Sequence, residues 1–238
     1  MKKAIIIGSS SGIGRALAKV LAAEGFCLGL AARRTDLLEE LGQELNTPTH
    51  IRVIDLAKQA QAMLNLNGLI EAMNGVDLII ISSGTGYLND GLEWEKEKET
   101  IDVNVSGFTA LVNVSLHYFL KKGEGTLAAI SSIAAIRGSA IAPSYNASKS
   151  FVSNYLEGIR CKIKKLKTNI NIIDIQPGFV ATDMAKGEGL FWVASPEKAA
   201  WQIYRNIKRG KEKAYVTKRW ALIAWVLRFI PDWLYHKL

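Results

Sequence analysis

Short apolar runs alternate with longer segments of helical periodicity along most of this 238-residue chain. The runs have the length of β-strands, and such alternation predicts a parallel sheet with helices on both faces. No repeat or linker interrupts the pattern, so we expect one doubly wound α/β domain with about seven strands. The expected strands are residues 4–7, 27–31, 50–54, 76–82, 126–131, 169–176 and 214–216, and the expected helices are residues 15–23, 36–45, 59–73, 98–120, 144–166 and 196–209.

The composition is typical of a globular protein in a reducing compartment. Hydrophobic residues make up 49% of the chain and charged residues 22%, which excludes a disordered chain or a coiled coil. Cys27 and Cys161 lack CxxC spacing and are expected to be small apolar fillers. Lys2 and Lys3 precede only four apolar residues, too few for a secretion signal, and no uncharged apolar run approaches the roughly 20 residues of a spanning helix. We therefore expect a cytoplasmic protein.

The positive charge is concentrated in the C-terminal third. The net charge is +8, and residues 158–238 contain 16 Lys and Arg against 6 Asp and Glu. The basic cluster from Arg160 to Lys167 is expected to face water on a long helix. No DNA-reading or RNA-binding motif accompanies the charge, so a nucleic-acid partner is not expected. His50, His117 and His236 share no ligand spacing, and no metal site is expected either.

A glycine-rich turn follows the first expected strand and leads directly into a helix. Glycines in this context let the backbone approach a pyrophosphate at the positive end of the helix, as in Rossmann-like folds. The alternative is an ordinary strand-to-helix turn, since the spacing is Gly-x3-Gly-x-Gly rather than the commoner GxGxxG. The residues expected to contact a dinucleotide here are Gly8, Ser10, Ser11, Gly12, Ile13 and Gly14.

Two arginines, Arg33 and Arg34, end the second expected strand. An acidic residue at this position binds the ribose 2′-hydroxyl of NAD, whereas arginine accommodates the 2′-phosphate of NADP. Asp36 lies beyond this position and is expected to cap the next helix instead. The sequence therefore favours NADP(H) over NAD(H), with two ordinary surface arginines as the alternative.

Tyr145 and Lys149 have the i, i+4 spacing that places two side chains on one face of a helix. A phenol titrates near 10, so Tyr145 needs a nearby cation to act as an acid–base group at neutral pH, and Lys149 carries one. Thirteen residues before Tyr145, Ser132 follows a strand at the sheet edge where such folds bind ligands. These residue types predict catalysis, although a lone YxxxK pair more often marks a solvated helix face.

With these residues in place, the chain resembles the single-domain branch of the short-chain dehydrogenase/reductase family. The resemblance implies that Ser132, Tyr145, Lys149 and Asn104 are catalytic, with Asn104 positioning a water molecule for proton transfer. It also implies that the following residues contact the cofactor, in addition to the glycine loop and the arginines: Asp55 and Leu56 beside the adenine, Ser83 and Gly84 after the fourth strand, Tyr145 and Lys149, and Pro177, Gly178, Val180 and Thr182 over the nicotinamide.

Two positions depart from the family pattern. Ile7 stands where threonine is usual, and residues 82–84 read Ser-Ser-Gly where Asn-Ala-Gly is usual. The resemblance implies hydride transfer between NADP(H) and a ketone, an aldehyde or a secondary alcohol. It also implies substrate loops near residues 85–98 and 185–197, and a homodimer or homotetramer. The alternative is a non-catalytic NADP-binding regulator of the same fold, although such relatives commonly lose the tyrosine or lysine that is present here.

Residues 218–238 form a basic, aromatic tail after an expected catalytic domain of residues 1–217. The tail contains three of the six tryptophans, Trp220, Trp225 and Trp233, together with flanking cations. This composition suits the interface between water and a membrane. Peripheral membrane contact is one interpretation, and the others are a packed helix, an oligomer contact or a lid over an apolar substrate. Similar tails in relatives that reduce lipid-like substrates favour a hydrophobic ketone.

Overall fold

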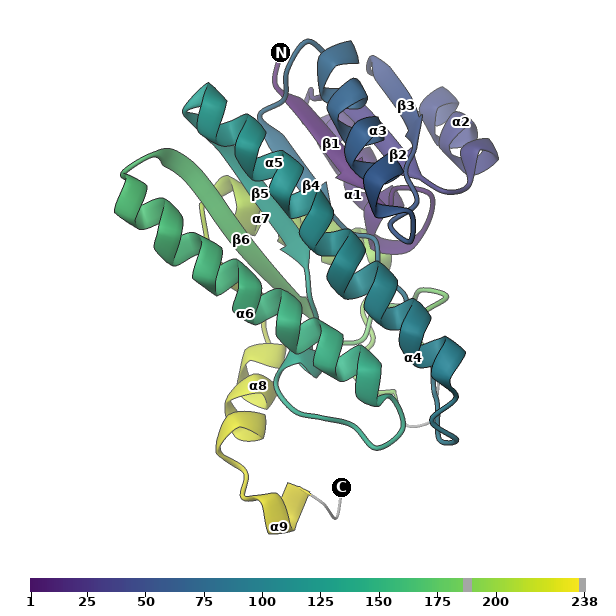
Figure 1. Cartoon of the computed structure of the whole chain (residues 1–238), viewed down its shortest axis with the longest axis vertical. Coiled ribbons are helices and arrows are strands. Elements are labelled where there is room, and N and C mark those ends of the chain that lie inside the picture. Colours follow the sequence, from purple (N-terminus) through teal and green to yellow (C-terminus); the bar gives the residue numbers. More distant parts are fainter. Residues whose placement is uncertain (186–189, 236–238) are drawn as a thin grey trace.

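The computed structural model describes residues 1–185 and 190–235. Within these residues, seven parallel strands form one sheet in the order β3-β2-β1-β4-β5-β6-β7 (Figure 1). This Rossmann-like, doubly wound arrangement confirms the predicted fold class. The strands are β1 (Lys3–Ile7), β2 (Cys27–Ala32), β3 (Thr49–Val53), β4 (Leu78–Ile81), β5 (Glu124–Ile130), β6 (Asn169–Pro177) and β7 (Lys213–Val216).

Helices cover both faces of the sheet. Helices α1 (Gly12–Ala23), α2 (Thr35–Glu44) and α7 (Pro196–Lys208) pack against one face. Helices α3 (Gln59–Ala72), α5 (Phe108–Lys122) and α6 (Pro143–Leu166) pack against the other. The remaining elements are α4 (Trp94–Ile101), a π-helical turn η1 (Asp102–Gly107), a 3-10 turn η2 (Ile133–Ala135), α8 (Trp220–Phe229) and α9 (Asp232–Tyr235).

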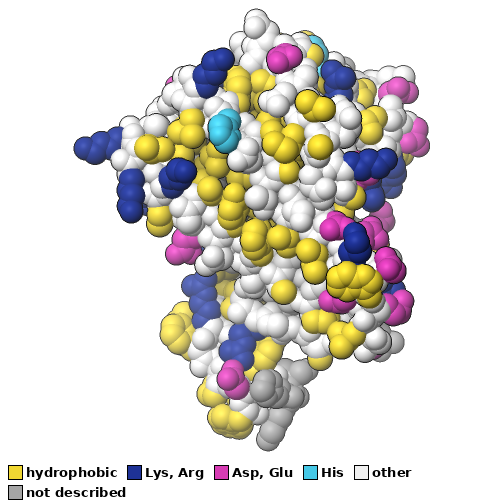
Figure 2. Space-filling model, in the orientation of Figure 1, with side chains coloured by type: hydrophobic (Ala, Val, Ile, Leu, Met, Phe, Trp, Pro, Cys, Tyr) yellow, Lys and Arg dark blue, Asp and Glu magenta, His cyan; other side chains and the backbone are white. Residues whose placement is uncertain are grey.

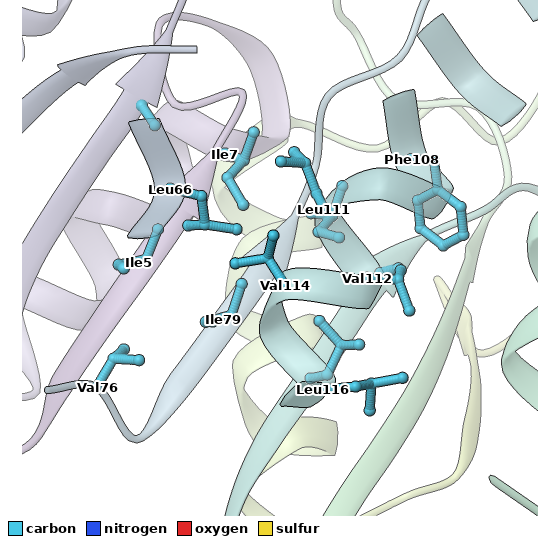
Figure 3. Close-up of a cluster of buried hydrophobic side chains, with 14 of the residues drawn as sticks. Ile5, Ile7, Leu66, Val76, Ile79, Phe108, Leu111, Val112, Val114 and Leu116 are labelled. Carbon is cyan, nitrogen blue, oxygen red and sulfur yellow. The ribbon is translucent and has the colours of Figure 1, made fainter. Parts of the chain in front are cut away.

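The central strands have apolar side chains on both faces, which explains their continuous apolar sequence. Ile5 and Ile7 of β1 belong to the same buried cluster as Leu66 of α3 and Leu111 of α5 (Figure 3). All four side chains are fully buried. Each such side chain contributes on the order of 1.5–3 kcal/mol through burial. Ile7, the first departure from the family pattern, is therefore part of the core.

Four expectations are corrected by the structure. The helix expected over residues 98–120 is α4, η1 and α5 in succession, because the chain forms a π-helical turn at Asp102–Gly107. Asp36 lies in the first turn of α2, whose N-cap is Arg34. The side chain of Arg160 is mostly buried, and its Nε donates to the carbonyl of Ile172. The lysines that follow it in α6 are exposed, as expected. Cys161 is exposed rather than a filler, and only Cys27 is buried.

The tail folds into two short helices, α8 and α9, at the end of the molecule opposite the N-terminus (Figure 1). Trp220 anchors α8, since it is 2% exposed and its ring lies 5.3 Å from that of Phe179 and 5.2 Å from that of Phe191. None of the helices in the described residues has the length and apolar character needed to span a membrane. Parts of the second expected substrate loop and of the tail, including His236, lie outside the described residues.

Candidate active site

A cavity of about 830 Å³ lies at the carboxyl ends of the strands. Its walls come from the segments that follow β1, β2, β3, β4, β5 and β6, so it spans the point where the strand order reverses between β1 and β4. Doubly wound sheets bind their ligands at this switch point. All of the sequence-predicted site residues except Asn104 line this one cavity. The fold therefore brings together residues that are far apart in the sequence.

The glycine loop after β1 forms a tight turn at the start of α1. Gly8 has a φ of +91°, and a Cβ on Gly14 would lie 2.0 Å from the carbonyl oxygen of Gly8. Only glycine allows this close approach of loop and helix. Ser11 is the N-cap residue of α1, but its side chain makes no capping hydrogen bond to the helix. The N–H groups of the first turn can therefore serve an anion, and this cradle fits the pyrophosphate of a dinucleotide.

Arg34 reaches back over the glycine loop. Its Nη2 donates to Ser10 Oγ at 3.0 Å and to Ser11 Oγ at 2.8 Å. Arg33 is exposed and lines the same cavity. Two guanidinium groups thus stand at the end of β2, where the adenosine ribose lies in folds of this class.

The turn after β4 fits closely on the glycine loop despite its altered sequence. A Cβ on Gly8 would lie 2.6 Å from the backbone nitrogen of Ser83, so the two turns are in direct backbone contact. Gly84 faces the interior, where a Cβ would lie 3.2 Å from Lys149 Nζ. Asp55 Oδ1 accepts a hydrogen bond from the Ala57 N–H at 3.1 Å and shapes the turn that presents Leu56 to the cavity.

Tyr145, Ser132 and Lys149 meet on the opposite wall. Tyr145 and Lys149 lie in the first two turns of α6, and Lys149 Nζ lies 5.7 Å from the centre of the Tyr145 ring. Ser132 follows β5, where its Oγ accepts the Ala134 N–H at 3.1 Å. Burial raises the pKa of the Tyr145 phenol, and a hydrogen bond with Ser132 acts in the opposite direction. Ser132 is thus the group that directly favours the ionised phenol.

Lys149 is buried at the base of this wall. Burial lowers the pKa of its ammonium group to about 8, and the negative charge of Asp174 opposes this effect. Nζ donates to the carbonyl of Ile130 at 3.1 Å. The hydrogen bond therefore orients the lysine, and its lowered pKa lets it lose its proton at mildly alkaline pH.

Asn104 lies in the π-helical turn and does not line the cavity. Its Oδ1 accepts the Thr85 N–H at 2.9 Å, and its Nδ2 donates to the Thr85 carbonyl at 2.7 Å and to Ser148 Oγ at 3.0 Å. The side chain thus joins the loop after β4 to helix α6. Its amide is committed to structural hydrogen bonds rather than left open to a substrate.

The segment after β6 closes the cavity on a third side. Pro177, Gly178, Val180 and Thr182 all line it, and a Cβ on Gly12 would lie 3.0 Å from Thr182 Cγ2, so this segment lies over the glycine loop. Gly178 packs directly under Trp220, because a Cβ there would lie 1.9 Å from the indole.

Two residues at the site, Gly86 and Arg137, do not belong to any of the sequence motifs. A Cβ on Gly86 would lie 2.4 Å from Cδ2 of Tyr145, so the loop after β4 packs its backbone against the ring of Tyr145. Arg137 lines the cavity and also pairs with Asp232 of α9 at 2.6 Å. Neither residue belongs to a spacing pattern that a single sequence could reveal. Among the described residues, no three His, Cys, Asp or Glu side chains gather as a metal ion would require.

The outer part of the cavity is apolar. Leu88, Ile141, Met184, Leu190 and Leu227 line it, and Leu227 comes from the tail helix α8. Together, the fold and the position of the cavity define a Rossmann-type nucleotide-binding fold.

Sequence comparison places the protein within this class. The profile of the short chain dehydrogenase family matches residues 2–190, and the chain belongs to this family. It is 32% identical over 246 residues to an uncharacterized oxidoreductase of Mycobacterium tuberculosis, and the match covers 97% of this chain and 94% of that protein. It is 31% identical over 188 residues to an uncharacterized oxidoreductase of Myxococcus xanthus, covering 77% of this chain and 74% of that protein.

Solved structures share the fold at low sequence identity. An alcohol dehydrogenase from the archaeon Thermococcus sibiricus, complexed with 5-hydroxy-NADP, matches with a TM-score of 0.80 and 24% identity over 91% of this chain and 96% of that one. A short chain dehydrogenase/reductase from Burkholderia phymatum, in complex with NAD, matches with a TM-score of 0.86 and 19% identity over 94% and 92%. Family membership makes this chain an oxidoreductase that acts on CH–OH or C=O groups with NAD(P)(H).

Proposed function

We propose that the protein is an NADP(H)-dependent reductase or dehydrogenase that interconverts an apolar or lipid-like ketone or aldehyde and its alcohol. The observation that carries this proposal is the shared cavity of the glycine loop, the two arginines and the Ser132–Tyr145–Lys149 group. Arg33 and Arg34 support a preference for the 2′-phosphate, since guanidinium groups match phosphate geometry. The apolar outer wall supports an apolar substrate.

Each of the four residues Ser132, Tyr145, Lys149 and Asn104 would have a separate role in carbonyl reduction. A bound nicotinamide would supply the hydride to the carbonyl carbon. Tyr145 would donate its phenolic proton to the carbonyl oxygen, and Ser132 would donate a hydrogen bond to the same oxygen as charge develops there. Lys149, buried beneath the Tyr145 ring, would stabilise the phenolate that remains. Asn104 would hold the loop after β4 against α6 through its hydrogen bonds to Thr85 and Ser148. In this way it would help to position a water molecule that returns a proton to Tyr145.

Cofactor binding is the first test. Titration of the purified protein with NADPH and with NADH, followed by intrinsic fluorescence, should show tighter binding of NADPH. The double variant Arg33→Ala/Arg34→Ala should lose this preference while it still binds NADH. Preference for NADH in the wild type would contradict the NADP(H) assignment, and binding of neither would contradict the cofactor-dependent function itself.

Catalysis separates an enzyme from a regulator. Tyr145→Phe should abolish NADPH oxidation with a panel of apolar ketones and aldehydes and leave the NADPH affinity nearly unchanged, because only the proton donor is removed. Full activity of this variant would contradict the role of Tyr145. A wild type that binds NADPH without reducing any member of the panel would favour the non-catalytic regulator.

The proposal extends to the tail, which carries an exposed apolar face. Leu222, Trp225, Phe229 and Trp233 are 61%, 61%, 69% and 66% exposed. Figure 2 shows hydrophobic side chains at this end of the molecule, with basic side chains and an acidic one among them. Asp232, the acidic residue of α9, is paired with Arg137, and Lys218, Arg219 and Arg228 carry the positive charge of the described part of the tail. Aromatic rings flanked by cations suit an anionic membrane surface, and we propose a cytoplasmic protein that contacts membranes peripherally.

Vesicle binding tests the tail without deleting it, because removal of the buried Trp220 would disturb the core. The wild type should co-sediment with vesicles that contain anionic lipid. The double variant Trp225→Ser/Phe229→Ser should co-sediment less. Leu64→Ser, which changes an equally exposed side chain on α3, is the control. If neither variant alters pelleting while the double variant dissociates a homodimer or homotetramer in sedimentation, the face is an oligomer contact instead.

A further inference from the structure

Two charged side chains are buried within the described residues, Lys149 and Asp174, which are 5% and 0% exposed. A buried charge is costly unless it is paired or hydrogen-bonded. Lys149 has a place in the proposed reaction, whereas Asp174 does not. The carboxylate of Asp174 therefore requires an explanation of its own.

Asp174 lies in β6, on the side of the sheet that faces α6. Ile170 and Ile172 precede it on this side and belong to the apolar core. From Asp174 onward, the β6 side chains on this side of the sheet are polar. Ser153 Oγ donates to Oδ2 at 2.7 Å and Gln176 Nε2 donates to the same oxygen at 2.8 Å, while Ser131 Oγ donates to Oδ1. Three donors converge on two oxygens, an arrangement that suits a carboxylate ion.

The partners of Asp174 flank the catalytic residues. Ser131 immediately precedes Ser132, and it immediately follows Ile130, whose carbonyl accepts the hydrogen bond of Lys149 Nζ. Ser153 lies one helical turn after Lys149 in α6. The carboxylate thus joins the end of β5 to the third turn of α6, one turn after Lys149.

Other charged and titratable groups face this pair from the neighbouring elements. Lys213 of β7 places Nζ 3.8 Å from Asp174 Oδ2 and is partly exposed. Tyr215 of β7 feels the charges of Asp174 and of Arg228 on α8. Tyr145 is the titratable neighbour of Lys149 on α6. Lys213 competes with Lys149 for the negative charge of Asp174, because both are cations.

We propose that Asp174 is a positioning residue of the active site, which fixes the Ser131–Ser132 turn and α6 around Lys149 and keeps the buried lysine protonated. The positioning rests on the hydrogen bonds of Ser131 and Ser153. The electrostatic part rests on the burial of both charged groups and on the attraction between the charge of Asp174 and the ammonium group of Lys149. Its importance for turnover rests on the proposed function, whereas its effect on the proton of Lys149 does not.

Lysine NMR tests the inference without any substrate. In protein labelled with ¹³C at the lysine ε-carbon, the Lys149 signal is identified by its loss in Lys149→Met and is then followed through a pH titration. Asp174→Asn preserves the shape of the side chain but removes its charge, so the pKa of Lys149 should fall by about one unit or more. Asp77→Asn, which neutralises a partly exposed carboxylate paired with Lys122, should leave the pKa of Lys149 unchanged.

A second variant should act in the opposite direction. Lys213→Gln removes the competing cation, so the pKa of Lys149 should rise by a few tenths of a unit. This variant decides the matter if Asp174→Asn does not fold, since Lys213 is partly exposed and tolerates the change. An unmoved Lys149 pKa in the folded Asp174→Asn protein, or an unmoved or lowered one in Lys213→Gln, would overturn the inference.

Turnover gives an independent measurement. If the wild type reduces apolar ketones, kcat should fall at alkaline pH as Lys149 loses its proton, and Asp174→Asn should move that fall to lower pH. A uniform loss of kcat with an unmoved alkaline limb would mean that Asp174 is only structural. If the wild type reduces no carbonyl compound, the proposed function fails, and the NMR titration still decides the role of Asp174.

Discussion

At the scale of single residues, the site depends on a glycine outside the dinucleotide-binding motif. Gly86 lies against the ring of Tyr145, so the position of the phenol is set in part by the backbone of the loop after β4. The motif residues that line the cavity could be selected from the sequence because they follow strand ends or, for Tyr145 and Lys149, share one face of a helix. Gly86 and Asp174 could not, because their roles arise from contacts between distant elements that one sequence does not encode as a pattern.

Gly86→Ala should reduce kcat at least tenfold with little change in NADPH affinity. The added methyl group would overlap the Tyr145 ring and push the phenol away from the reacting carbonyl, and such displacement of a catalytic group is costly for the rate. Gly91→Ala is the matched control in the same loop, where a Cβ would meet only Glu93 Cγ at 3.9 Å. Steady-state kinetics checks the prediction, and equal kcat values for the two variants would contradict it.

The buried Lys149 should make the stability of the fold depend on pH. Its pKa is about 8 in the folded protein and near 10.5 in the unfolded chain. Between these values the unfolded chain binds more protons, so stability should rise with pH through this window. From pH of about 7.5 to about 9.5, the unfolding free energy of the wild type relative to Lys149→Met should increase by about 2 kcal/mol. Urea unfolding at the two pH values measures this difference, and a constant difference would mean that Lys149 titrates normally.

At the scale of elements, the strands were the most predictable part of the structure. Their apolar runs reflect burial on both faces, and the observed bounds differ from the expected ones by at most two residues at either end. The π-helical turn η1 was not predictable, because its residue types are compatible with an ordinary helix. At the end of this turn, Gly107 packs so closely on Leu56 that a Cβ would lie 2.2 Å from the Leu56 carbonyl oxygen.

Gly107→Ala should therefore destabilise the protein by about 1–3 kcal/mol, because the methyl group has no space and the backbone must shift. It should also weaken NADPH binding, since Leu56 lines the cavity. Gly158→Ala is the control within a helix, where a Cβ meets nothing within 4 Å. This second change should stabilise the protein by up to about 1 kcal/mol through helix propensity. Thermal and urea unfolding would contradict the packing argument if both variants behaved alike.

At the scale of the whole molecule, the tail is an integral part of the fold. The sequence identified its composition but left its position open. In the structure, Trp220 is buried against Gly178, Phe179 and Phe191, and Leu227 and Tyr235 line the cavity. The tail thus packs on the domain and also forms part of the cavity wall, which were two of the alternatives that the sequence left open. The opposite face of α8 remains exposed.

Trp220→Ala should cost about 3–5 kcal/mol of stability, as expected for removal of a large buried ring. It should also remove the ring contacts of Phe179 and Phe191 and raise KM for an apolar substrate more than for NADPH. Trp225→Ala removes an exposed ring of the same helix and should change stability by less than about 0.5 kcal/mol. Similar unfolding midpoints for the two variants would mean that α8 is not anchored by Trp220.

Strand β1 and helix α9 are far apart in the sequence but border one cavity, and this has a consequence for biosynthesis. Gly8 belongs to the first strand–helix turn and Tyr235 to the last helix, yet they line the same cavity. A ribosome makes the phosphate-binding turn early, but the substrate side has no complete wall until α8 and α9 leave the exit tunnel. Nascent chains should therefore form the glycine-loop side of the cavity before they can close its opposite wall, and a chain that stops before α8 would lack Trp220 and leave the rings of Phe179 and Phe191 uncovered.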